Sequence, residues 1–219
     1  MEQVAFDPRL QGPFTMMVAG PTSCGKSQLV LNLIKNTDTL VYPPVKDITY
    51  CYTQWQPAFE ELQGRVTFRE GMISREEVMS PGKAGRAHSL LVIDDLTDEE
   101  NGPLVKDLFI RGSHHRRISV IFITQNLFLQ GKDFRTISIN SHYVILFKNP
   151  RDRSQIQSLA RQCFPGNSRF LTDVYTSETS DPHSYIVLDF KQDTPDRLRV
   201  RNSITSPKKT GVFIPTKKK

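Results

Sequence analysis

The chain has 219 residues, of which 37% are hydrophobic and 24% charged, and it carries a formal net charge of +6. This size and composition fit a folded domain with a substantial core and exclude a wholly disordered chain. The apolar runs are too short for a transmembrane helix of about 20 residues, the first residues lack the pattern of a secretory signal, and three widely spaced cysteines support neither a disulfide scaffold nor a zinc knuckle.

Apolar runs that fit buried strands alternate along the chain with segments whose apolar residues recur at helical spacing. Continuous apolar strands of this kind are typical of a mostly parallel sheet with helices on both faces. Two later strands fit a C-terminal β-hairpin at the sheet edge. We therefore predict one α/β domain over residues 1–206 and a basic tail at 207–219, in which 212–214 could dock. In chain order, the predicted strands are 14–19, 47–52, 66–68, 89–93, 119–124, 143–147, 184–189 and 198–204, and the predicted helices are 28–35, 57–62, 103–111 and 154–163.

The positive charge is concentrated in two blocks. Residues 111–169 carry ten basic and two acidic side chains, and residues 207–219 carry five lysines and no acid. One interpretation is a solvated face followed by a disordered tail. The other is a face that binds polyanions, either nucleotide or nucleic acid. The cations between 148 and 161 could line a DNA pore or simply coat a helix.

The segment Gly20-Pro21-Thr22-Ser23-Cys24-Gly25-Lys26-Ser27 matches the phosphate-loop pattern G-x-x-x-x-G-K-[ST] at every fixed position. Its glycines let backbone N–H groups converge on a phosphate, and the following helix adds free N–H groups and its positive dipole end. In such a loop Lys26 contacts the β- and γ-phosphates, and the Ser27 hydroxyl ligates Mg²⁺. We predict ATP and Mg²⁺ as ligands, and we interpret Cys24 as a small filler.

The strand at 89–93 ends on two acids, Asp94 and Asp95. A buried strand with a carboxylate at its C-terminal end is how this kind of fold brings an acid to Mg²⁺. We predict that Asp94 holds the metal through water and that Asp95 polarises the attacking water as a general base. The second acid favours an ATPase over a nucleotide kinase or a GTPase, and the chain lacks the [NT]KxD motif that reads guanine.

Polar and cationic residues flank the strand at 119–124. Gln125 follows it directly and is the predicted γ-phosphate sensor, with Asn126 as the second candidate and a loop-capping amide as the alternative. Arg111 and Arg116 precede the strand. Either could reach the γ-phosphate bound by a neighbouring subunit of a ring, or could be solvated or face DNA.

In this order and spacing, GPTSCGKS, LLVIDDL and SHHRRISVIFITQN resemble the FtsK/HerA class of P-loop ATPases. The run from 111 to 161 resembles, more narrowly, the genome-packaging ATPases of polintons, adintoviruses and related large DNA viruses and transposons. The poxvirus packaging ATPase is a more distant relative. The resemblance covers about residues 12–165. It implies a RecA-like P-loop core that forms a ring, usually a hexamer, and pumps double-stranded DNA into a preformed capsid.

The resemblance also implies roles, partners and a location. It assigns phosphate and Mg²⁺ binding to 20–27, metal and base roles to Asp94 and Asp95, and the sensor role to Gln125, while the arginine finger stays open. The implied partners are double-stranded DNA, a capsid or portal-vertex protein and further copies of the chain, with no membrane. The implied location is intracellular, in the host nucleus or a virus factory, with the virion as a further place.

Two other functions remain open from the sequence. A superfamily-3-like hexameric viral replicative helicase would share the phosphate loop, the double acid and a polar residue after the strand, here Asn126. A non-catalytic assembly adaptor would use bound nucleotide only as a switch. The lysine tail could add DNA affinity, act as a nuclear localisation signal or bind the capsid.

Overall fold

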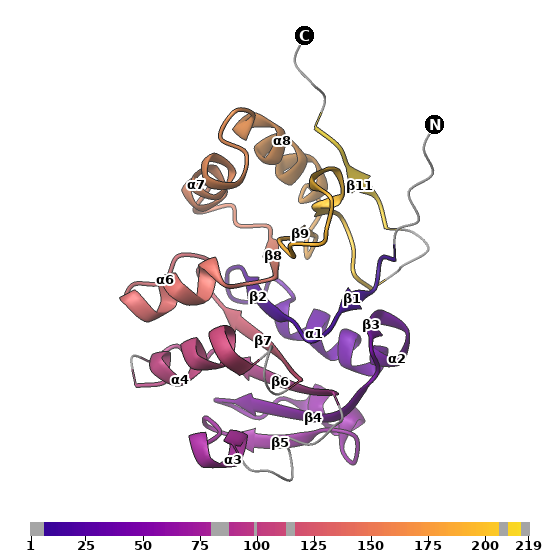
Figure 1. Ribbon diagram of the computed structural model, residues 1–219, viewed down its shortest axis with the longest axis vertical. Coiled ribbons are helices and arrows are strands. Elements are labelled where there is room, and N and C mark those ends of the chain that lie inside the picture. Colours follow the sequence, from indigo (N-terminus) through magenta and orange to yellow (C-terminus); the bar gives the residue numbers. More distant parts are fainter. Residues whose placement is uncertain (1–6, 80–87, 99, 113–116, 206–209, 216–219) are drawn as a thin grey trace.

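A computed structural model describes residues 7–79, 88–98, 100–112, 117–205 and 210–215. Its centre is a twisted sheet with helices on both sides (Figure 1). The strands of this sheet are β2 (Thr15–Ala19), β4 (Val45–Tyr52), β5 (Thr67–Glu70), β6 (His88–Asp94), β7 (Ile118–Thr124), β8 (Tyr143–Phe147), β9 (Tyr185–Asp189), β10 (Val200–Arg201) and β11 (Val212–Phe213). Two short strands, β1 (Leu10–Gln11) and β3 (Val41–Tyr42), pair with each other in parallel beside it.

The main sheet has the strand order β11-β10-β9-β8-β2-β7-β6-β4-β5. The strands from β8 to β5 run parallel to one another, whereas β9, β10 and β11 are added in antiparallel fashion. The carboxyl ends of β2, β6 and β7 therefore lie at one edge of the sheet. Because β2 lies between β8 and β7, the loop that follows β2 sits near the middle of that edge.

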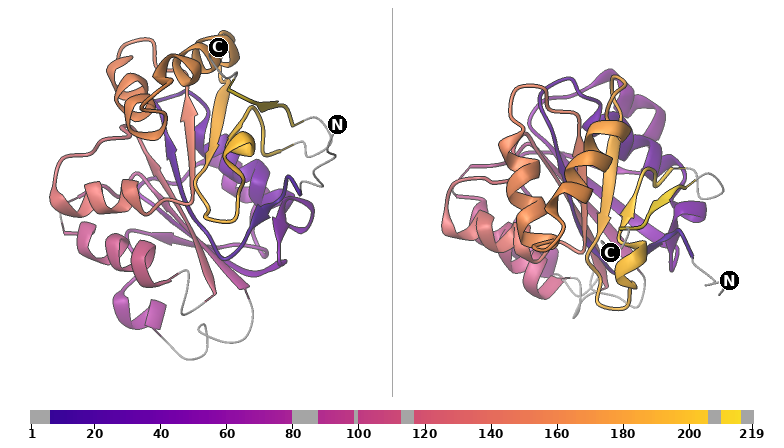
Figure 2. Two further views of the ribbon diagram at one scale, coloured as in Figure 1. Left: turned by 45° about the horizontal axis from the view of Figure 1, so that its top comes forward. Right: turned by 90° about the horizontal axis from the view of Figure 1, so that it is seen from above.

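Helices cover the two faces of the sheet unequally, as Figure 2 shows. One face carries three elements, α1 (Lys26–Lys35), α2 (Thr37–Leu40) and the 3₁₀ helix η1 (Pro57–Leu62). The opposite face carries α3 (Arg75–Met79), α4 (Gly102–Asp107), the π-helical turn η2 (Leu108–Gly112), α6 (Lys132–Ile139), α7 (Ser154–Cys163) and α8 (Ser168–Glu178). A short 3₁₀ turn, η3 (Asp196–Leu198), precedes β10. None of the described helices has the length and apolar character needed to cross a bilayer.

The double-sided cover explains why the central strands are apolar throughout. On β2, Met16 and Val18 pack into the core beneath α1, whereas Met17 and Ala19 pack into the core beneath the larger helical layer. Alternate side chains of a strand point to opposite faces, so a strand buried on both faces needs apolar residues at every position.

The predicted fold class is confirmed: the domain is α/β, with a mostly parallel sheet, helices on both faces and antiparallel C-terminal strands at one edge. Each predicted strand is present, although the one expected at 198–204 is reduced to β10. The helix expected at 103–111 is divided into α4 and η2. Within the segment expected as a tail, β11 pairs with β10. Six further elements have no counterpart among the predicted ones: β1, β3, α2, α3, α6 and α8.

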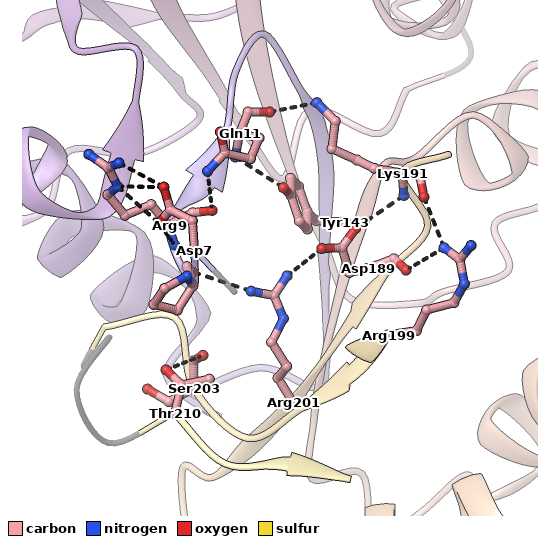
Figure 3. Close-up of polar contacts among 11 residues, drawn as sticks. Asp7, Arg9, Gln11, Tyr143, Asp189, Lys191, Arg199, Arg201, Ser203 and Thr210 are labelled. Atoms are coloured by element: carbon pink, nitrogen blue, oxygen red, sulfur yellow. Dashed lines mark hydrogen bonds and ion pairs between the residues drawn. The ribbon is translucent and has the colours of Figure 1, made fainter. Parts of the chain in front are cut away.

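A buried polar network ties the N-terminal segment to the last strands of the sheet (Figure 3). Arg201 of β10 donates to an Asp189 carboxylate oxygen at 2.6 Å and to the Pro8 carbonyl at 3.2 Å. Lys191 donates to the Gln11 carbonyl at 2.7 Å. Burial raises the pKa of Asp189, and the charge of Arg201 opposes that rise. Because Asp189 pairs with the first residue of β8, this network lies at the sheet edge opposite the loop after β2.

Candidate nucleotide-binding site

The loop at 20–27 has the backbone that a phosphate cradle needs. Gly25 adopts a φ of 105°, a region that only glycine enters without strain. At Gly20, an added Cβ would lie 2.7 Å from the Phe147 Cβ, so only glycine fits there. The ammonium of Lys26 donates to the carbonyls of Gly20 and Pro21 at 2.7 and 2.9 Å. The loop thus holds its lysine at the start of α1, at the edge where the parallel strands end.

Ser27 and Asp94 meet directly across this edge. The Ser27 hydroxyl donates to Asp94 Oδ2 at 3.0 Å, although 67 residues separate them in the chain. The Tyr50 hydroxyl donates to the same oxygen at 2.6 Å. Asp94 is only 7% exposed. Burial raises the pKa of Asp94, and the hydrogen bonds from Tyr50 and Ser27 oppose that rise by favouring the carboxylate.

Asp95 faces solvent beside its buried neighbour. Its φ of 56° lies in the left-handed region, which asparagine and aspartate tolerate better than most residues, and its N–H donates to the Ile123 carbonyl on β7 at 3.1 Å. The Gln125 side-chain amide donates to Asp95 Oδ2 at 3.2 Å. The backbone turn after Asp94 therefore separates the two acids, with one directed to Ser27 and the other to Gln125.

The two amides after β7 have different surroundings. Gln125 contacts Asp95, as described, whereas the Asn126 side-chain oxygen accepts from Gln155 of α7 at 3.3 Å. The Leu127 N–H donates to the Gln155 side chain at 2.8 Å, which holds this turn against α7. Of the two candidates for a sensor, Gln125 is the one whose side chain contacts an acid of the site, Asp95.

Arg111, the one candidate arginine within the described residues, is not brought into this site within one chain. The side chain of Arg111 is 67% exposed and forms an ion pair with Asp107 at 3.4 Å, one helical turn earlier. Arg116 lies outside the described residues, as do His114 and His115.

A pocket of about 490 Å³ opens in front of these groups. This volume lies within the range of about 300–1,000 Å³ that is common for small-molecule sites. The lining residues are Thr22, Ser23, Gly25, Lys26, Ser27, Gln28, Tyr52, Thr53, Gln54, Gln56, Asp94, Asp95 and Gln125. A second hollow, of about 450 Å³, lies near the amino ends of β4 and β6 and contains none of the predicted site residues.

Sequence reasoning missed three parts of this site. Tyr50 and the loop from Tyr52 to Gln56 come from β4 and the turn after it. The ring of His183 contacts the Cys24 carbonyl at 3.2 Å, from the turn before β9. The sequence could have predicted the position of the loop after β4. A strand is predicted at 47–52, and the carboxyl ends of parallel strands lie at the same edge of a sheet. Burial raises the pKa of the Cys24 thiol, which agrees with a filler rather than a reactive role.

The donor set fits a magnesium ion bound together with phosphates. Mg²⁺ prefers oxygen ligands, keeps several of its waters and uses only one or two protein carboxylates alongside substrate phosphates. Ser27 and Asp94 supply one hydroxyl and one carboxylate at the pocket wall. Within the described residues, no cluster of three His, Cys, Asp or Glu side chains offers an all-protein metal cage.

Comparison with known proteins gives similarity in structure but not in sequence. No protein-family model matches the chain, and no curated protein matches it in sequence. The genome packaging NTPase B204 from Sulfolobus turreted icosahedral virus 2, in complex with ATP-γS, is similar with a TM-score of 0.53 and 11% identity, over 96% of this chain and 99% of that one.

The cytoplasmic domain of the Type VII secretion ATPase EccC from Thermomonospora curvata is similar with a TM-score of 0.55 and 14% identity. The match covers 83% of this chain but only 24% of the EccC chain. At such identities the similarity establishes architecture alone. Together with the strand order and the loop after β2, it shows that the chain has the RecA-like fold of P-loop NTPases.

Proposed function

We propose that this chain is a Mg²⁺-dependent ATPase that moves double-stranded DNA into a viral or transposon capsid as part of a ring. The observation that carries the ATPase assignment is the contact between Ser27 and Asp94 at 3.0 Å. It joins the phosphate loop to the acidic strand end, with Asp95 and Gln125 paired beside it. The phosphate loop, the two acids and the amide line one open pocket.

Each group has a role in this proposal. Ser27 and Asp94 would hold Mg²⁺, which neutralises charge on the β- and γ-phosphates when it is bound. Lys26 would exchange its carbonyl partners for phosphate oxygens. Asp95, an exposed carboxylate at the pocket wall, would orient the attacking water and accept its proton, and Gln125 would fix the position of that carboxylate.

The DNA and capsid parts of the proposal have separate support. Exposed cations follow β8 and start α7, including Arg151 and Arg153, within the block of ten basic residues. Contacts from such cations to phosphates would be insensitive to sequence and sensitive to salt. The similarity to the genome packaging NTPase B204, which spans nearly the whole of both chains, favours packaging over other uses of this fold.

The helicase and the adaptor are less well supported. A helicase would place Asn126 at the γ-phosphate, but Asn126 is engaged by Gln155 and is not among the residues that line the pocket. An adaptor would not need the hydrogen bond between Gln125 and Asp95 at the solvent-facing side of the site.

One set of measurements tests the proposal. The ATPase rate of the full chain is measured in Mg²⁺ with and without double-stranded DNA, together with the mass in solution in the presence of ATP. We expect turnover that DNA stimulates and a mass several times that of one chain. Asp95→Ala should still bind ATP and lose about 10²–10⁴-fold in rate.

Lys26→Ala should lose nucleotide binding, whereas Lys35→Ala, at the other end of α1 and paired with Glu61, should behave as wild type. A function that stays intact in the Asp95→Ala variant, despite its loss of ATP hydrolysis, would support the adaptor. Strand separation by the wild type would support the helicase. The ATPase rate is also measured for Arg111→Ala and for Arg116→Ala, each mixed with wild-type subunits. The variant that lowers the rate of the mixture identifies the arginine finger.

A further inference from the structure

Tyr50 has no role in the site as predicted from the sequence, yet its hydroxyl makes the shortest hydrogen bond to Asp94. The residue lies inside β4 with no exposed surface, and its hydroxyl is 2.6 Å from Asp94 Oδ2. The register between β4 and β6 pairs Tyr50 with Val92, two residues before Asp94. The tyrosine therefore reaches diagonally along the sheet to the carboxylate.

We propose that Tyr50 is a positioning residue that holds the Asp94 carboxylate in the orientation needed for Mg²⁺. This inference rests on the proposed nucleotide site and concerns how that site binds its metal. A carboxylate next to a metal is commonly fixed by an outer hydrogen-bond donor, and loss of such a donor typically costs 10–100-fold in metal affinity or activity.

The arrangement of donors around Asp94 supports this role. Ser27 and Tyr50 both donate to Oδ2, so this oxygen is committed to the protein. Oδ1 is then the oxygen that can face the ion or one of its waters. Because the Ser27 hydroxyl donates its hydrogen bond to Asp94, the lone pairs of its oxygen are left for a metal. The two hydrogen bonds thus orient both predicted metal ligands at once.

The ring of Tyr50 is itself held in place by packing. Its centroid lies 5.0 Å from that of Phe59 and 5.7 Å from that of Phe68, and those two rings stack at 4.7 Å. Phe59 belongs to η1 and Phe68 to β5, so two neighbouring elements fix the tyrosine rotamer. A donor fixed in this way keeps its carboxylate partner in one orientation before the ligand arrives.

The alternative is that Tyr50 contributes to folding only. Tyr143 provides a matched comparison, because it is also a buried tyrosine, 1% exposed, on a central strand. Its hydroxyl accepts from the Gln11 N–H at 3.0 Å, at the edge of the sheet opposite the site (Figure 3). Both substitutions remove the hydroxyl of a buried tyrosine, but only the Tyr50 hydroxyl contacts Asp94.

The test measures how strongly Mg²⁺ tightens nucleotide binding. The affinity of the full chain for ATP-γS is determined by calorimetry in EDTA and again in saturating MgCl₂, for wild type, Tyr50→Phe and Tyr143→Phe. We expect Tyr50→Phe to keep the affinity in EDTA within about twofold and to lose about 10-fold or more of the Mg²⁺ enhancement. Tyr143→Phe should keep both values.

A full Mg²⁺ enhancement in Tyr50→Phe would overturn the inference, as would an equal loss of affinity with and without the metal. Asp94→Asn supplies a second check: adding Tyr50→Phe to it should change the enhancement no further, and a further loss would show that the tyrosine acts independently of Asp94. If the wild type itself shows no Mg²⁺ enhancement, the proposed function fails, which is distinct from a failure of the Tyr50 assignment alone.

Discussion

Arg201→Met should destabilise the fold far more than loss of an equally short ion pair at the surface. The Arg201 and Asp189 side chains are 1% and 4% exposed and lie 2.6 Å apart. Removal of the cation leaves a buried carboxylate without the guanidinium and removes the hydrogen bond that Arg201 donates to the Pro8 carbonyl. Breaking a buried pair costs about 3–5 kcal/mol, and two charge-assisted hydrogen bonds at about 1.5–3 kcal/mol each give a similar total.

The comparison variant is Arg9→Met. Arg9 and Asp7 lie 2.7 Å apart, but their side chains are 39% and 41% exposed. Exposed pairs contribute about 0–1 kcal/mol, because water screens the charges and already solvates both groups. The two pairs have nearly the same distance, so the difference between the variants reports burial.

The assay is urea unfolding at neutral pH, followed by circular dichroism and by the fluorescence of Trp55, the single tryptophan. For a domain of this size, a loss of 3–5 kcal/mol corresponds to a fall of about 6–20 °C in the unfolding temperature. Asp189→Asn combined with Arg201→Met should lose less than the sum of the two single variants, because the buried charge is removed with its partner. Two results would refute the reasoning. One is a loss of less than about 1 kcal/mol in the free energy of unfolding for Arg201→Met, and the other is a loss in the double variant that equals the sum of the two single losses.

Two further predictions concern the buried His88 and the phosphate loop. His88 is buried, with ring nitrogens bonded to the Pro43 carbonyl and the Ser119 hydroxyl, and burial lowers its pKa from 6.5. The unfolded chain therefore takes up a proton first as the pH falls below about 6.5, and the free energy of unfolding should decline there. In His88→Gln the free energy of unfolding should depend less steeply on pH over this range. Gly25→Ala should weaken ATP-γS binding about 5- to 30-fold, since a φ of 105° costs an alanine about 1–2 kcal/mol. Gly166→Ala, where an added Cβ meets nothing within 4 Å, should bind as wild type in the same titration.

The parts of the site that follow directly after strands could be predicted from the sequence. Lys26, Asp94, Asp95 and Gln125 each lie within seven residues of the end of a central strand. Apolar strands at this spacing imply a parallel sheet, and a parallel sheet brings its carboxyl ends together. The pattern could therefore place these groups at one edge without any knowledge of the strand order.

Tyr50 could not be found in this way. It lies 44 residues before Asp94 and inside a strand, where a tyrosine is expected for packing alone. Its contact with Asp94 depends on β4 lying next to β6 and on the register between them. The same limit applies to Arg201, whose burial depends on the pairing of β10 with β9. Helix α8 lies between the predicted helix at 154–163 and the predicted strand at 184–189, in a segment for which the sequence pattern predicted no element.

The two edges of the sheet have different physical requirements. At the carboxyl edge, Asp95 and Gln125 are exposed, as the proposed contact with a ligand requires, and the loop before Lys26 contains two residues with positive φ, Ser23 and Gly25. At the amino edge, Asp189 and Arg201 form an ion pair with each other and are shielded from water. Changes at the amino edge should therefore alter the free energy of unfolding without altering the response to Mg²⁺. Tyr50 combines features of both edges. It is buried as fully as the residues at the amino edge, yet its hydroxyl contacts Asp94, the carboxylate that would hold a metal in the proposed function.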